Sequence, residues 1–337
     1  MKLLKDLLYK VSLNAVHGST HLAIAHISFD SRNIKKDTLF IAIQGTQSDG
    51  HAFIDNAIKQ GAVAIVCNRL PLSQNPDITY ILVQNTSEAL GRISCNYFDN
   101  PSEQTKLVGI TGTNGKTTTA TLLFEVFTLL GYNCGLISTV ENRIGKTKTP
   151  STHTTPDAYS LNALLRDMVQ QKCNYVFMEV SSHAQDQKRT SGLFFSGGIF
   201  SNLTRDHLDY HKTFEAYRDA KKSFFDQLHP DSFALTNLDD RNGLFMLQNC
   251  KAKAYTYAIS QPAHYNARIL EQHVNGTLLR IDQLDVWIKL IGVFNAYNML
   301  AIYACGLLLK QDKTNLLSAM SQVKSVAGRF QYIEGSE

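Results

Sequence analysis

The sequence predicts an α/β protein, with a small N-terminal α/β domain and a larger central domain built on a mostly parallel sheet. Three observations support this fold class. The chain has 337 residues, which is long for one ordinary domain. Short β-branched runs alternate with helical stretches through the centre of the chain, as in strands joined by crossover helices. A loop rich in glycine and threonine separates one such run from the helix that follows it.

The composition is that of a soluble globular chain that folds throughout. Hydrophobic residues make up 44% and charged residues 18%, with a net charge of +4. Because Lys and Arg are scattered along the chain, nucleic acid is not an expected partner. Six widely spaced cysteines form no CxxC pair, so we expect buried thiols in a reducing cytoplasm. We also expect a monomer.

The N-terminus predicts an amphipathic helix. Within the first 13 residues, apolar side chains recur on one helical face with Lys and Asp between them: Leu3, Leu4, Leu7, Leu8 and Val11. A signal peptide needs an uninterrupted apolar stretch instead. The longest apolar run, residues 299–309, falls well short of the roughly 20 residues of a membrane span. No membrane segment is expected.

The first hundred residues predict the small α/β domain. Four short β-rich runs are punctuated by a helix near 53–59 and closed by a helix that starts at Thr86, the runs being 27–31, 39–43, 62–66 and 80–83. A turn cluster at 99–102 follows, and the pattern changes there. We therefore expect domains at 1–100 and 101–326, with 327–337 as the stump of a linker.

The central part predicts alternating strands and helices. The expected strands are 106–111, 134–139, 175–180, 197–202 and 233–238, and the expected helices are 116–130, 157–172, 214–228 and 295–309. Residues 252–291 predict hairpin-like strands with a turn at Asn275-Gly276. This alternation favours a largely parallel sheet with helices on both faces.

The segment 111–118, Thr-Gly-Thr-Asn-Gly-Lys-Thr-Thr, predicts a phosphate-binding loop. It lies between a predicted strand and a predicted helix, where backbone N–H groups and the helix N-terminus surround phosphate oxygens. Lys116 would contact the β and γ phosphates, and Thr117 would place its hydroxyl on Mg²⁺. The loop is a variant, because Ile110 stands where the general motif has its first glycine. The alternative is an ordinary glycine-rich turn that opens a helix.

Acidic and imidazole side chains follow two later strands. Glu179 ends a predicted strand, at the sheet edge where α/β proteins bind ligands. Residues 201–211 place two His and two Asp in a predicted loop, and Asp206-His207 with Glu179 favours a metal site over turns and caps. For Glu179 alone, metal binding and capping stay equally open. Lys221 and Lys222, by composition alone, are solvated helix charges.

Together these segments resemble the Mur ligase family over nearly the whole chain. The markers are FDSR at 29–32, LFIAIQGTQSDGH at 39–51, TGTNGKTT at 111–118, HTTPD at 153–157, MEVSSH at 178–183, SNLTRDHLDYH at 201–211, AK at 220–221 and FNAYNMLA at 294–301. The resemblance implies an ATP- and Mg²⁺-dependent ligase that adds a diamino acid to UDP-N-acetylmuramoyl-L-alanyl-D-glutamate in peptidoglycan synthesis, with diaminopimelate favoured over lysine as the commoner case.

The resemblance also implies roles for individual residues. ATP would contact Gly112, Thr113, Asn114, Gly115, Lys116, Thr117, Thr118, Asn295, Asn298 and Arg329. Magnesium would be held by Thr117, Glu179, His207 and Lys221, the last as a CO₂-derived carbamate. Catalysis would rest on Lys116, Glu179, His207 and Lys221. The UDP-linked dipeptide would contact Phe29, Ser31, Thr46, Gln47, Ser48, Thr154, Thr155, Ser181, Gln187 and Arg189.

Two further expectations concern completeness and alternatives. The resemblance implies a third, Rossmann-like domain that supplies the amine site, and we expect this chain, which runs to Glu337, to lack it. We therefore expect this chain to bind the UDP-linked dipeptide without completing ligation. A folate polyglutamate-type ligase would share the phosphate loop but not the first hundred residues. A non-catalytic protein that binds UDP-linked wall precursors would have no need of Lys116, Glu179, His207 and Lys221.

Overall fold

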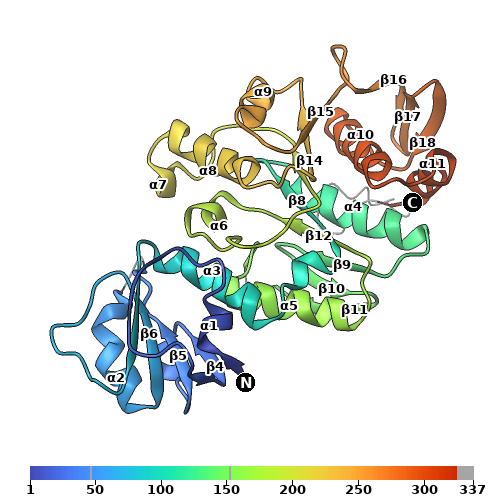
Figure 1. The fold of residues 1–337 in the computed structure, drawn as a ribbon. Helices are drawn as coiled ribbons and strands as arrows, with labels where there is room; N and C mark the ends of the chain where they lie inside the picture. Colours follow the sequence, from blue (N-terminus) through green and yellow to red (C-terminus); the bar gives the residue numbers. More distant parts are fainter. Residues whose placement is uncertain (46–47, 152, 325–337) are drawn as a thin grey trace, which may run out of the picture. The chain divides into compact units, whose positions relative to one another are not determined.

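The computed structural model describes residues 1–45, 48–151 and 153–324. The chain divides into two compact units (Figure 1). The first comprises Met1–Ser102, Pro156–Arg166 and Gln187–Leu193, and the second comprises the remaining residues. The main segment of the first unit ends close to the expected boundary at residue 100. Two short segments from the centre of the chain join it, although the sequence assigned them to the central domain.

The first unit is built on a parallel sheet with one antiparallel edge. Its sheet order is β2-β7-β6-β5-β4, in which only the β2–β7 pair is antiparallel. The elements are β1 (Lys2–Leu3), α1 (Leu4–Leu7), β2 (Leu13–His17), β3 (Ala23–Ile24), β4 (His26–Ser28), β5 (Thr38–Ile41), α2 (Ile54–Lys59), β6 (Ala62–Cys67), β7 (Thr79–Val83) and α3 (Thr86–Tyr97). Short 3-10 turns occupy Ser31–Asn33, Gly50–Phe53 and Pro101–Glu103.

Both faces of this sheet are buried. Leu39 and Ile41 of β5 pack into one apolar cluster with α1 and α3, whereas Phe40 and Ala42 pack into another with α2. Successive side chains of a strand point to opposite faces, so a strand covered on both sides becomes a continuous apolar run. The run at 39–43 predicted from the sequence has this origin.

The predicted N-terminal helix is wrong in its length. Helix α1 is a single turn, Lys10 adopts a left-handed φ of 57°, and β2 begins at Leu13. The leucines that suggested the helix do anchor this segment, since Leu4, Leu7 and Leu8 are buried. The residues that follow form β2, whose backbone pairs with β7, and such tertiary pairing outweighs a short helical periodicity.

The second unit contains an eleven-stranded sheet, ordered β11-β10-β9-β12-β8-β13-β14-β15-β16-β17-β18. Its strands are β8 (Lys106–Thr111), β9 (Cys134–Ile137), β10 (Glu141–Ile144), β11 (Thr147–Pro150), β12 (Tyr175–Glu179), β13 (Gly197–Phe200), β14 (Phe233–Asn237), β15 (Lys253–Ala258), β16 (Tyr265–His273), β17 (Gly276–Ile281) and β18 (Leu284–Ile288). Its helices are α4 (Lys116–Leu129), α6 (Ser182–Asp186), α7 (Leu208–His211), α8 (Phe214–Asp226), α9 (Gly243–Leu247), α10 (Val293–Leu308) and α11 (Lys313–Gln322), and α5 (Ala158–Gln170) links the two units.

Seven strands, in the sheet order β9-β12-β8-β13-β14-β15-β16, pair in parallel, and the first five of them are the strands for which the sequence predicted this pairing. Both edges depart from the prediction. Strands β10 and β11 form an antiparallel hairpin that the sequence analysis missed, because its side chains are polar and largely exposed and give no apolar run. The hairpin-like segment 252–291 is antiparallel only from β16 onwards, since β15 pairs in parallel with β14.

Helices cover both faces of the central strands. Val108 and Ile110 of β8 pack into a large apolar cluster with α4, α10 and α11, which lie side by side in Figure 1. Gly109 faces the other way, where a Cβ would lie 2.5 Å from the ring of Phe224 on α8. The expected arrangement of a parallel sheet between two layers of helices is confirmed.

No helix within the described ranges has both the length and the apolar character needed to cross a membrane. All six cysteines are free thiols, and five are buried. Burial raises the pKa of Cys173 to about 11, which keeps that thiol protonated near neutral pH.

The central core yields a stability prediction. Phe177 on β12 is fully buried against Phe127 of α4, with ring centroids 5.0 Å apart. Phe177→Ala should lower the free energy of unfolding of the second unit by about 3–5 kcal/mol, because it leaves a cavity. Chemical denaturation measures this loss. The control is Leu129→Ala, at a half-exposed helix end, which should change stability by less than about 1 kcal/mol; equal losses would contradict the assigned core.

Candidate active site

The loop between β8 and α4 depends on two glycines. Gly112 has a φ of 148° and Gly115 a φ of 86°, a backbone region that side chains rarely adopt. A Cβ on Gly112 would overlap the hydroxyl of Ser201, and one on Gly115 would lie 2.8 Å from Asn298 Oδ1. These glycines let the loop turn tightly at the N-terminus of α4, where the helix dipole favours a bound anion.

A second loop, which follows β13, holds the first in place. Ser201 Oγ donates to Asn114 O at 2.6 Å, Asn202 Oδ1 accepts from the Asn114 N–H at 3.0 Å, and Asn202 O accepts from the Thr113 N–H at 2.8 Å. The two loops meet because β8 and β13 are parallel neighbours in the sheet. Residues 201–202 therefore hold the phosphate loop through hydrogen bonds. The sequence analysis expected them only as part of the polar run 201–211.

Two lysines share one carbonyl oxygen of this loop. Lys116 Nζ donates to Gly112 O at 2.9 Å and to Thr113 O at 2.8 Å, and Lys221 Nζ from α8 donates to Gly112 O at 2.8 Å. Lys221 is only 1% exposed. Burial, and then the nearby charge of Lys116, hold the pKa of Lys221 well below its usual range. The neutral amine is therefore far more accessible for Lys221 than for an exposed lysine.

Glu179 ends β12 beside this loop. It pairs in register with Ile110 of β8, just before the loop begins. Its side chain is 0% exposed. The Thr139 N–H donates to Oε1 at 2.7 Å, and the Thr139 hydroxyl lies 3.1 Å from Oε2. A buried carboxylate at a sheet edge, next to a phosphate loop, supplies the oxygen ligands that Mg²⁺ prefers.

His207 lies in the segment between β13 and α8. It has a left-handed φ of 50° at the start of α7, and its side chain is 47% exposed. Its ring lies 4.9 Å from that of His183, which follows β12. His211, by contrast, is buried and its Nε2 lies 2.9 Å from Ser182 Oγ; burial lowers its pKa. His207 is therefore the accessible imidazole of this segment.

The described residues include no cluster of three or more His, Cys, Asp or Glu side chains placed to hold a metal ion. The expected Asp206-His207-Glu179 combination does not form such a cluster. A cation here could take one ligand each from Thr117, Glu179 and His207, and would need further oxygen ligands. Mg²⁺ commonly takes such ligands from phosphates and water. The hydroxyl and carboxylate present fit that requirement.

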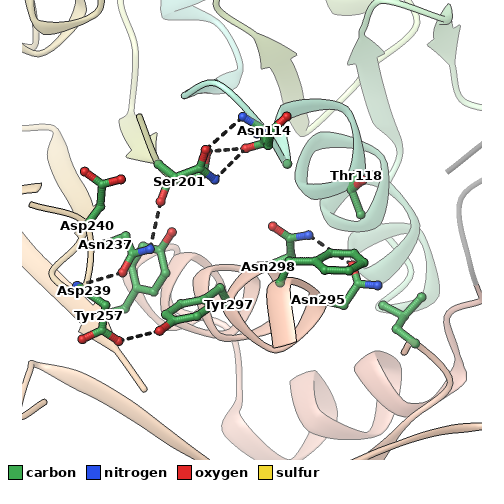
Figure 2. A pocket seen from close by; sticks show the side chains of 14 residues that line it. Asn114, Thr118, Ser201, Asn237, Asp239, Asp240, Tyr257, Asn295, Tyr297 and Asn298 are labelled. Atoms are coloured by element: carbon green, nitrogen blue, oxygen red, sulfur yellow. Dashed lines mark hydrogen bonds between the residues drawn. The ribbon is translucent and has the colours of Figure 1, made fainter. Parts of the chain in front are cut away.

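A pocket of about 520 Å³ adjoins the phosphate loop (Figure 2). Such a volume suits a small ligand. The structure brings five of the predicted nucleotide residues to it, namely Asn114, Gly115, Thr118, Asn295 and Asn298. The two asparagines of α10 are linked, with Asn298 Nδ2 donating to Asn295 Oδ1 at 3.2 Å. Asn298 also accepts from the Thr119 hydroxyl at 3.3 Å, which ties α10 to α4.

Sequence analysis missed seven of the residues that line this pocket. They are Asn237, Asp239, Asp240, Tyr257, Leu290, Phe294 and Tyr297. Asp239 accepts from the Tyr297 hydroxyl at 2.8 Å and from the Ser260 N–H at 2.9 Å. Burial opposes its ionisation, yet these bonds lower its pKa. The available signal was position: Asn237 ends β14, and residues 238–240 follow it at the same sheet edge as Glu179.

The residues expected to contact the UDP-linked dipeptide are distributed over both units. In the first unit Arg189 donates to Gln187 Oε1 at 2.7 and 3.0 Å, and Ser48 O accepts from the Gly45 N–H at 2.9 Å. Ser31 begins the 3-10 turn after β4, and Phe29 lies between β4 and that turn. In the second unit Ser181 Oγ accepts from the Ala184 N–H at 3.2 Å, and Thr154 Oγ1 lies 3.1 Å from Thr139 Oγ1.

Thr155 differs from the others, because it is fully buried and its hydroxyl donates to Glu179 O at 2.8 Å. Its hydroxyl therefore holds the backbone at the end of β12. Its contact with substrate, and the roles of the other residues expected at this site, stay predictions. Thr46, Gln47 and Arg329 lie outside the described residues.

The fold and site define a nucleotide-binding α/β protein, and the comparisons with known proteins give its family. Residues 110–306 match the family described as Mur ligase middle domain, and residues 23–98 match the Mur ligase family, catalytic domain. The UDP-N-acetylmuramoyl-L-alanyl-D-glutamate–2,6-diaminopimelate ligase of Cytophaga hutchinsonii is 52% identical over 329 residues, covering 97% of this chain and 68% of that protein. The enzyme of the same name from Clostridium tetani is 37% identical over 340 residues, covering 98% of this chain and 69% of that protein.

Solved structures agree with the sequence matches. A structure of a UDP-N-acetylmuramoyl-L-alanyl-D-glutamate–2,6-diaminopimelate ligase superposes with a TM-score of 0.84 at 26% identity, covering 100% of this chain and 69% of that one. MurF from Acinetobacter baumannii shares the fold, with a TM-score of 0.66 at 17% identity over 99% of this chain and 71% of that one. The chain belongs to the Mur ligase family.

Membership confirms three sequence predictions: the family, the α/β fold class and the class of ATP-dependent acid–amino-acid ligases. It also implies the use of ATP and Mg²⁺. The chain spans 68% of the length of the Cytophaga relative.

The loop geometry predicts the effect of a single methyl group. Gly112→Ala should weaken Mg·ADP binding by at least about 10-fold, because the new Cβ pushes the loop away from Ser201 and turns its N–H groups. Titration with a fluorescent nucleotide measures this. Gly131→Ala is the matched control: Gly131 also has a positive φ, of 92°, but a Cβ there meets nothing within 4 Å. Nucleotide affinity equal to wild type in Gly112→Ala would contradict the assigned loop.

Proposed function

We propose that this chain carries the ATP- and precursor-binding parts of a ligase that adds meso-diaminopimelate to UDP-N-acetylmuramoyl-L-alanyl-D-glutamate. One observation carries the proposal: the phosphate loop, the buried Glu179 and the buried amine of Lys221 meet at one edge of one sheet. The relatives are named as diaminopimelate ligases, and this supports the choice of substrate.

The proposed reaction has two steps. The γ-carboxylate of the D-glutamyl residue attacks the γ-phosphorus of ATP, giving an acyl phosphate and ADP. The amine of diaminopimelate then attacks the acyl carbon, phosphate leaves, and the amine loses a proton. The first step brings two anions together, so catalysis consists mainly of positioning and neutralising charge.

The position of each residue supports a different role in this reaction. The ammonium of Lys116, at the first turn of α4, would leave its loop carbonyls for the phosphate oxygens, which are stronger acceptors because they are charged. Glu179 and the hydroxyl of Thr117 would hold Mg²⁺, with His207 contributing to a second ion. Bound magnesium would neutralise phosphate oxygens during the transfer.

Lys221 would serve as a carbamate. A neutral amine adds to CO₂ and loses a proton, which converts a cation into an anion able to bind a metal. The lowered pKa of Lys221 favours the neutral amine that this addition requires. The same modification would also remove the repulsion between Lys221 and Lys116, whose ammonium groups share Gly112 O.

Calorimetry with Lys116→Ala tests the proposed function. The wild-type chain should bind both a non-hydrolysable Mg·ATP analogue and the UDP-linked dipeptide. Lys116→Ala should weaken nucleotide binding by roughly 10- to 100-fold, from the loss of charge-assisted bonds, and leave dipeptide binding unchanged. Lys106→Ala is the control, since Lys106 is an exposed residue at the opposite end of β8. Equal effects of the two substitutions, or no dipeptide binding by wild type, would refute the assignment.

Carbamylation of Lys221 has a direct spectroscopic test. With ¹³C-bicarbonate, the wild-type protein should give a carbamate carbon signal that disappears in Lys221→Arg. Lys222→Arg should retain it, because the neighbouring Lys222 pairs with Asp226 outside the core, and an ion-paired ammonium is a poor nucleophile toward CO₂. A signal that persists in Lys221→Arg would place the modification elsewhere.

A further inference from the structure

Thr139 contacts both carboxylate oxygens of Glu179, although no motif drew attention to it. It lies in the short connection between β9 and β10. Its N–H and its hydroxyl reach Oε1 and Oε2 at 2.7 and 3.1 Å. Ser138 shapes this connection, since its hydroxyl donates to Glu141 O at 2.7 Å. The carboxylate is thus held by a residue that is itself exposed.

These two bonds determine how the carboxylate is oriented. A buried carboxylate is costly unless hydrogen bonds replace its lost hydration. One donor on each oxygen also restricts rotation of the carboxylate plane, so the lone pairs left over point in a defined direction. Removing the hydroxyl would leave Oε2 without this donor and leave the plane held through Oε1 alone.

Thr139 also joins Glu179 to Thr154. The hydroxyl oxygens of the two threonines lie 3.1 Å apart. The Thr139 hydroxyl has one proton, so it serves one acceptor at a time. Thr139 is the donor in both contacts. The ionised carboxylate is the stronger acceptor, and Thr154 Oγ1 competes with it for the same proton.

We infer that Thr139 is a positioning residue for the carboxylate that binds Mg²⁺, and that Thr154 competes with this carboxylate as a second acceptor for the Thr139 hydroxyl. The inference rests on the proposed function, in which Glu179 holds the metal. It links the segment expected to contact the UDP-linked dipeptide to the metal ligand within a single unit of the structure.

The test measures the Mg²⁺ concentration that gives half-maximal enhancement of ADP binding, using the full chain and a fluorescent ADP. Thr139→Val keeps the shape and the backbone N–H but removes the hydroxyl, and should raise this concentration by about 10-fold, the value of one hydrogen bond to a charged group. Thr139→Ser keeps the hydroxyl and should stay within about 2-fold of wild type. ADP affinity without metal should be equal in all three proteins.

Thr154→Val examines the second link. Alone it should lower the same concentration by about 3-fold, because it removes the competing acceptor, and combined with Thr139→Val it should add nothing, because both changes act through one hydroxyl. Additive effects would overturn the link to Thr154. A Thr139→Val protein that matches wild type, or a Thr139→Ser protein as impaired as Thr139→Val, would overturn the positioning role. If Mg²⁺ does not change ADP binding by the wild-type protein, the metal site in the proposed function is refuted instead.

Discussion

The parallel pairing of β12, β8, β13 and β14 is the constraint on which the site depends. These strands are neighbours in the sheet and run in one direction, so the segments that follow them emerge at a common edge. Those segments supply the phosphate loop and Glu179. They also supply Ser201 and Asn202, which bond the phosphate loop, and the aspartates after β14. Residues more than a hundred positions apart in the sequence therefore lie together in one site, and no long loop is needed to bring them there.

The second organising feature is the meeting of two lysine amino groups at Gly112 O. Lys116 of α4 and Lys221 of α8 both donate to this oxygen. Burial and mutual repulsion both disfavour the charged form of Lys221. A nucleotide would draw Lys116 outward and a carbamate would change the sign of Lys221, so both expected events relieve the same repulsion.

Around this centre, neutral hydroxyl and amide groups set the positions of the charged ones. Thr139 and Thr155 bond the carboxylate and the backbone of Glu179, Thr113 bonds Tyr217 at 3.0 Å, and Asn298 ties two helices together. These groups do not change charge near neutral pH, so they can keep the acidic and basic side chains in place while those exchange partners.

The sequence by itself determined the family, the alternating strands and helices of both domains, and the phosphate loop with Glu179 at a strand end, because each leaves a local mark in periodicity, glycine spacing or strand-end position. The polar β10–β11 hairpin left no such mark, and the longer helix predicted at the N-terminus was overridden by the pairing of β2 with β7. Only the tertiary structure decided that Lys221 is buried against Gly112, that Thr139 holds Glu179, and that Asp239 and Tyr297 wall the pocket. Each of these is a contact between segments far apart in the chain, and burial and direction of a side chain depend on its neighbours in space.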